Sequence, residues 1–187
     1  MHSLVKLFCR GNQDVYKKYH HNKKFSFGPS HASICTGLEL TYNWNCFCNL
    51  ADIPGDVAEY SKIFINCGQH PASSKHHTAA EYRDVILKLV DGGKRKKLQV
   101  SKLVWIESVP MPVRNDALIK EVKDWRTYHR IMLFNNISET IMRKHNVTIV
   151  RAFGAVLPLV DKLCDGMHYT AENAVKPILY SIAREFF

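Results

Sequence analysis

Apolar residues recur along this chain in two rhythms. Three short apolar runs, SKIFINCG (61–68), KLVWIES (102–108) and VTIVRAF (147–153), have the length and composition of strands buried on both faces. A further segment, LELTYNWNCF (38–47), alternates apolar and polar residues and is rich in aromatic side chains. That alternation also predicts a strand.

Between these runs the apolar residues follow helical spacing. The segment 78–93 begins with Thr78 as a predicted N-cap, has Glu81 three residues later and ends at a pair of glycines that predicts a stop. Residues 114–145 form a long helical stretch with a predicted break near Asp124, and further helices are predicted at 2–8 and from Ala171 onward. Helices of ten or more residues between strands predict βαβ crossovers, and hence an α/β fold with a mostly parallel sheet and helices on both faces.

Length, charge and hydropathy narrow the class of protein. A chain of 187 residues with 46% hydrophobic residues is expected to form one domain, spanning 1–187. It contains no apolar run of about 20 residues, so no membrane segment is expected, and its first residues show no secretory signal. The net charge of +9 is concentrated in residues 16–24 and 92–97. Such runs are either solvated loops or sites for an anionic partner, and no nucleic acid is expected because no aromatic-interleaved pattern accompanies them.

Six cysteines occur without a Cys-x-x-Cys pair, which argues against a zinc knuckle or a thioredoxin-like site. Cys67 lies in an apolar run, where a buried free thiol is expected. The even count leaves disulfides open if the protein is secreted. The sequons that begin at Asn136 and Asn146 matter only in that same compartment.

Polar residues follow each predicted buried strand at its carboxyl end, where α/β proteins bind ligands. The first run is followed by 66–70, the second by Glu107 and Ser108 with 114–116 beyond, and the last by Asp165 and His168. An Asp three residues before a His can orient it as a general base. It can equally be a turn residue ahead of a helix, so the pair leaves both interpretations open.

Together these blocks resemble the SGNH hydrolases, and within them the PC-esterase branch, which contains esterases and O-acyltransferases of cell-surface glycans. The segment CDGMHYT resembles the family's final Asp-x-x-His block, which implies that Asp165 and His168 are catalytic. The segment FINCGQHPAS resembles the oxyanion block, which implies roles for Gly68, Gln69 and His70, with His70 standing where many members have Asn. WIESVPMPVRND resembles the strand and proline-rich loop that follow, and the resemblance runs from about Glu39 to Tyr180.

One block of the family pattern is absent, because the chain contains no Gly-Asp-Ser nucleophile block. Gly28-Pro29-Ser30-His31 mimics it, but Ser30 is followed almost at once by a predicted strand and is a weak candidate. The resemblance then implies a chain that begins after the first, central strand and is inactive in this form.

The resemblance implies acyl transfer on acyl esters of glycans, an esterase with water as acceptor or an O-acyltransferase with a sugar hydroxyl. No metal or nucleotide cofactor is implied. Two alternatives remain: a non-catalytic remnant that binds a glycan or a protein partner, and a basic nucleic-acid-binding α/β domain.

Overall fold

The computed structural model describes residues 30–35, 38–42, 61–95, 98–111, 123–162 and 172–185. The chain divides into two compact units, Met1–Asn45 and Cys46–Phe187. The expectation of a single domain stays a prediction.

The smaller unit contains a two-stranded antiparallel ribbon. Strands β1 (Ser30–Cys35) and β2 (Leu38–Tyr42) pair with Ser30 opposite Tyr42. The predicted strand in LELTYNWNCF is therefore confirmed for its first half. The partner strand β1 was not indicated by the sequence pattern.

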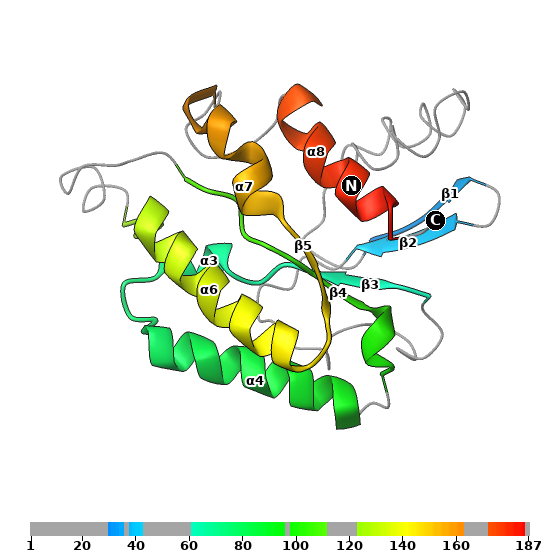
Figure 1. The fold of residues 1–187 in the computed structure, drawn as a ribbon, viewed down its shortest axis with the longest axis horizontal. Helices are drawn as coiled ribbons and strands as arrows, with labels where there is room; N and C mark the ends of the chain where they lie inside the picture. The colour runs from blue at the N-terminus through cyan, green and yellow to red at the C-terminus, as the bar shows by residue number, and fades with distance from the viewer. Residues whose placement is uncertain are drawn as a thin grey trace. The chain divides into compact units, whose positions relative to one another are not determined.

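The larger unit alternates strands and helices (Figure 1). Its described elements are, in chain order, β3 (Ile63–Ile65), α3 (Gln69–Ser73), α4 (Ala79–Arg95), β4 (Leu103–Ile106), α6 (Tyr128–Lys144), β5 (Thr148–Val150), α7 (Ala152–Val156) and α8 (Glu172–Ala183). A short 3-10 turn, Val100–Lys102, leads into β4, and another, Leu157–Lys162, follows α7.

The three strands of the larger unit form a parallel sheet in the order β3-β4-β5. Ile63 lies opposite Leu103, and Val104 lies opposite Thr148. Parallel neighbours require crossover connections, which α4 and α6 supply. The predicted α/β fold with a mostly parallel sheet is confirmed. The missing first strand stays a prediction, because residues 1–29 lie outside the described part of the chain.

Helices cover both faces of this sheet. Leu103 and Trp105 of β4 belong to a buried cluster with residues of α4 and α6, including Ile86 and Phe134. Side chains alternate along a strand, so Val104, which is fully buried, faces the opposite side. Figure 1 shows α4 and α6 together on one side of the sheet, with α7 and α8 on the other. The expected three layers are present.

Helix boundaries follow the sequence in some places and depart from it in others. The capping box is confirmed, because the Thr78 backbone N–H donates to Glu81 Oε2 at 2.7 Å and the Glu81 backbone N–H donates to Thr78 Oγ1 at 3.2 Å. The expected stop at Gly92 is wrong, since α4 continues to Arg95. Buried Val90 and Leu98 anchor this end in the core, and that packing overrides the low helix propensity of glycine.

Residues 123–127 are not helical, which agrees with the predicted break near Asp124, and residues 114–122 of the predicted helical stretch lie outside the described part of the chain. Lys123 has a φ of 51°, and α6 begins only at Tyr128, with the Thr127 side chain accepting a hydrogen bond from the Arg130 backbone N–H. The last apolar run forms a shorter strand than expected, because α7 already begins at Ala152.

Candidate functional site

The carboxyl ends of β3, β4 and β5 meet at one edge of the sheet because the strands are parallel. The loop after β3 and the loop after β4 are packed directly on each other. At Gly68, an added Cβ would lie 2.2 Å from Ser108 Oγ and 3.2 Å from Ser108 Cβ. Only glycine permits this approach.

Asn66 ties the same two loops together. Its Nδ2 donates to the Ile106 carbonyl at 2.9 Å and to Ser108 Oγ at 3.3 Å. The predicted oxyanion block therefore starts from a position fixed against β4.

Asn135 of α6 holds the other side of Ser108. The Ser108 backbone N–H donates to Asn135 Oδ1 at 2.9 Å, and Asn135 Nδ2 donates to the Ser108 carbonyl at 2.8 Å. Both residues are buried. Asn135 was not among the predicted site residues. It carries a sequence signal nonetheless, because it is a polar residue within the apolar stripe of α6, at helical spacing from Ile131 and Ser138.

Tyr82 of α4 fixes the backbone at Cys67. Its hydroxyl donates to the Cys67 carbonyl at 2.6 Å, and its ring stacks on Phe134 with centroids 4.2 Å apart. Burial raises the pKa of Tyr82 above its usual value, so the phenol remains a donor over the ordinary pH range. Cys67 itself is disulfide-bonded. The expectation of a free thiol at Cys67 is therefore wrong.

Gln69 and His70 differ sharply in their surroundings. Gln69 Nε2 donates to the Val109 carbonyl at 2.7 Å, while its Oε1 is buried and accepts no hydrogen bond within the described part of the chain. His70 is exposed, and among the described residues its imidazole has no hydrogen-bond partner. The Gln69 side chain thus attaches the loop from Asn66 to His70 to the loop after β4, and the His70 side chain remains exposed to solvent.

Arg130 of α6 holds the carboxyl end of α3. Its Nε donates to the Ala72 carbonyl at 2.9 Å, and its terminal nitrogen donates to the Ser74 carbonyl at 2.7 Å and to that of His77. The carbonyls of Ala72 and Ser74 are at the end of α3, where a helix leaves carbonyls without intrahelical partners, and His77 lies in the segment that follows. The segment that carries His70 is therefore held at both ends.

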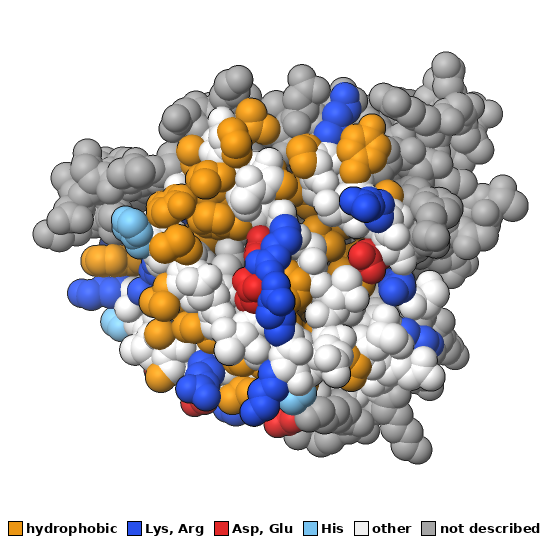
Figure 2. Space-filling model, in the orientation of Figure 1, with side chains coloured by type: hydrophobic (Ala, Val, Ile, Leu, Met, Phe, Trp, Pro, Cys, Tyr) orange, Lys and Arg blue, Asp and Glu red, His pale blue; other side chains and the backbone are white. Residues whose placement is uncertain are grey.

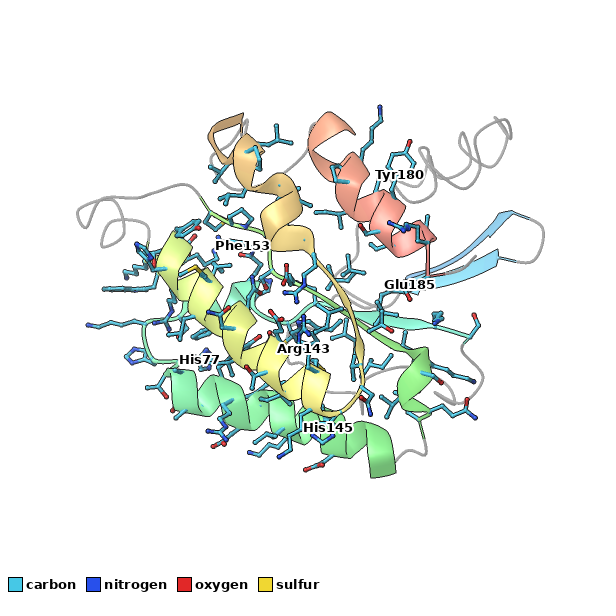
Figure 3. All side chains as sticks on the ribbon, viewed as in Figure 1. His77, Arg143, His145, Phe153, Tyr180 and Glu185 are labelled. Atoms are coloured by element: carbon cyan, nitrogen blue, oxygen red, sulfur yellow. The ribbon has the colours of Figure 1, made fainter. Side chains whose placement is uncertain are left out.

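A charged cluster occupies the same edge between β4 and β5. Glu107 is buried, and it accepts from Arg151 at 2.8 Å and from the Phe153 backbone N–H at 3.1 Å. Arg151 also donates to Glu139 Oε2 at 2.6 Å, and Arg143 donates to Glu139 Oε1 at 2.7 Å. Figure 2 shows blue and red side chains meeting near the middle of this face, and Arg143 is labelled in Figure 3.

The cluster shifts the ionisation of its members. Hydrogen bonding to Arg151, with a smaller contribution from Arg143, lowers the pKa of Glu139. Hydrogen bonding to Glu139, together with Glu107, raises the pKa of Arg151. Glu107 was expected at a strand end, but nothing in the sequence indicates Arg151 as its partner.

The other predicted site residues are Asp165, His168 and Ser30. Asp165 and His168 lie outside the described residues, and their roles stay predictions. Ser30 is the first residue of β1 in the other unit, opposite Tyr42 in an antiparallel ribbon. Within the described ranges, no three His, Cys, Asp or Glu side chains gather as a metal site would require, and no helix is long and apolar enough to cross a membrane.

Comparison with known proteins gives one structural similarity. No protein-family model and no curated protein matches the chain. A solved structure, the lipase/acylhydrolase from Enterococcus faecalis, is similar over 67% of this chain and 62% of its own length, with 17% identity and a TM-score of 0.49. The match thus spans less than two thirds of that protein, and a similarity at this level does not assign the chain to a family.

Proposed function

We propose that this chain is an SGNH-type, PC-esterase-like protein that binds acyl esters of glycans and acts on them as an esterase or an O-acyltransferase. Gly68 and His70 hold the oxyanion, Gln69 fixes their loop, and Asp165 orients His168 as the general base. The glycan substrate and the roles of Asp165 and His168 rest on the sequence resemblance.

The observation that supports the proposal most is the construction of the loop from Asn66 to His70. Gly68 packs on Ser108, and Gln69 is hydrogen-bonded to the Val109 carbonyl, yet the imidazole of His70 stays exposed. An oxyanion site stabilises developing charge most when its donors are fixed before the reaction begins. A rigid backbone that carries one open donor side chain is what such a site requires.

The expected rate is low, because the chain has no Gly-Asp-Ser block to supply the nucleophile. Loss of the nucleophilic Ser typically lowers kcat by about 10⁶, and the oxyanion site and substrate binding leave a residual rate of roughly 10³–10⁴ over water. In that residual reaction His168 takes a proton from water, and the water oxygen attacks the ester carbonyl. The carbon–oxygen bond to the leaving alcohol then breaks, and that oxygen receives the proton from His168.

The test is hydrolysis of p-nitrophenyl acetate by the purified chain. We expect a slow reaction above the buffer rate that His70→Ala and His168→Ala each reduce to near that rate. Surface histidines also hydrolyse this ester, so His76→Ala is the matched control, because His76 is exposed and lies outside the proposed site.

Two outcomes would count against the proposal. A rate that is equal in all variants, or equal to buffer alone, favours the non-catalytic alternative. Activity abolished by Ser30→Ala would show that the serine of β1 is the nucleophile and that the site is built differently.

A further inference from the structure

Asn146 occupies the turn between α6 and β5, close to His145, which is labelled in Figure 3. It is the first residue of the sequence Asn146-Val147-Thr148, the acceptor pattern for N-linked glycans. Its side chain is exposed, and no hydrogen bond to its amide is found among the described residues. The amide nitrogen is therefore accessible in the folded chain.

The backbone around Asn146 explains this exposure. The Asn146 N–H donates to the Arg143 carbonyl at 3.0 Å, and the Val147 N–H donates to the Met142 carbonyl at 3.0 Å. With Asn146 at a φ of 56°, these bonds form a Schellman closure of α6, and Val147 and Met142 belong to one buried cluster. Asn146 closes the helix through its backbone, and its side chain is not needed for the cap.

The second sequon, at Asn136, is placed quite differently. Asn136 lies in the middle of α6, and its sequon serine, Ser138, is fully buried and donates to the carbonyls of Phe134 and Asn135. Presenting this sequon as a surface loop would unwind α6 at Asn135, which holds Ser108. The folded structure thus distinguishes two patterns that are equivalent in the sequence.

A separate observation concerns the compartment. Cys67 is disulfide-bonded. Disulfides persist in the oxidising secretory pathway and are rare in the cytosol. N-linked glycosylation takes place in that same pathway, so the disulfide and the accessible sequon indicate one location by independent chemistry.

We propose that Asn146 is an N-glycosylation site of this protein and that Asn136 is not. The donor is a lipid-linked oligosaccharide pyrophosphate. The bond between Asn146 Nδ2 and the anomeric carbon forms, the bond from that carbon to the pyrophosphate oxygen breaks, and the lipid pyrophosphate leaves. One amide proton is lost to a base of the transferase. The glycan then projects from the turn into solvent.

The experiment is expression of the 187-residue chain behind a cleavable leader in cultured eukaryotic cells, followed by peptide N-glycosidase treatment of the whole lysate. Whole lysate reports on the chain whether or not it is exported. We expect one step in apparent mass that the glycosidase removes.

Two variants remove the site while keeping the fold. Asn146→Gly retains the preferred residue type for a left-handed helix end, and Thr148→Val keeps a β-branched residue in β5. Both should lose the mass step, and Asn136→Gln should keep it. Cooperative thermal unfolding of Thr148→Val made in bacteria checks that the variant folds.

The contrary results are equally definite. A wild-type chain without a glycosidase-sensitive step would overturn the proposal, as would a step that survives in both Asn146→Gly and Thr148→Val or disappears in Asn136→Gln. Alkylation of Cys67 without a reductant would remove the compartment argument and count against it.

Discussion

At the carboxyl edge of the parallel sheet, the contacts on the two sides of β4 differ in kind. Between β3 and β4 the contacts are neutral: Gly68 packs on Ser108, and Asn135 forms two hydrogen bonds with the Ser108 backbone. Between β4 and β5 the contacts are ionic, with Arg151 bridging Glu107 and Glu139. A carboxylate beside an oxyanion would repel its negative charge. The neutral contacts between β3 and β4 therefore suit the proposed ester site, and the ionic contacts between β4 and β5 suit a purely structural role.

Asn135→Leu should produce the largest loss on the neutral side. It removes both partners of the Ser108 backbone and leaves a buried N–H and a buried carbonyl unsatisfied, each at a cost of about 1–3 kcal/mol. We expect urea unfolding to show a lower free energy of unfolding by about 2–6 kcal/mol. The matched control is Asn136→Ala, its exposed neighbour, for which about 0.5 kcal/mol or less is expected. Equal effects of the two variants would mean that the Asn135 contacts contribute little.

Gly68→Ala comes next, because its Cβ would meet Ser108 Oγ at 2.2 Å while Asn135 holds the Ser108 backbone. Overpacking of this kind costs about 1–3 kcal/mol. Gly154→Ala provides the contrast, since nothing lies within 4 Å of the added Cβ and the residue is in α7. Alanine is favoured over glycine in a helix by roughly 0.5–1 kcal/mol, so this variant should unfold at a slightly higher urea concentration. A neutral Gly68→Ala would refute the close packing of the two loops.

Acid should reduce the contribution of the ionic contacts to the free energy of unfolding, and it should leave the contribution of the neutral contacts unchanged. Because the folded-state pKa of Glu139 is lowered by Arg151, its contribution to stability is present above the ordinary Glu pKa of about 4.3 and is lost as pH falls through the lower folded value. The difference in unfolding free energy between the chain and Glu139→Gln should be largest near neutral pH and shrink below about pH 4.3. For Asn135→Leu the corresponding difference should be independent of pH. A Glu139→Gln difference that grows in acid would contradict the sign of the shift.

The comparison also shows what the sequence could predict. The positions of β3, β4 and β5 and the Thr78–Glu81 cap depend on neighbouring residues, and their local signals were sufficient, whereas β1 had no such signal. Asn135 and Ser108 are 27 positions apart, and Arg151 and Glu107 are 44 apart. Asn135 can be noticed in the sequence because it is a polar residue in an apolar helical stripe, but the residues around it do not indicate that Ser108 is its partner. The expected free thiol at Cys67 and the expected stop of α4 at Gly92 were both wrong. For α4 the reason is the packing of Val90 and Leu98 in the core, which the local glycine signal does not report.

For the candidate site, the sequence predicted polar residues at the carboxyl ends of β3 and β4. The loop from Asn66 to His70 does meet Ser108 at this edge. Which of these residues fixes the loop and which stays open could not be read from residue types, because Gln69 and His70 are adjacent and both polar. Their difference arises from the position of the Val109 carbonyl. The roles of Asp165 and His168 stay predictions.

The most direct test of the central claim, that His70 and His168 serve one ester site, is a double-mutant cycle. It compares p-nitrophenyl acetate hydrolysis by the chain, by His70→Ala, by His168→Ala and by the double variant. Residues that act as a unit in catalysis are strongly non-additive. We expect the double variant to be no slower than the slower single variant. Losses that multiply independently, as they do for residues in separate sites, would contradict it.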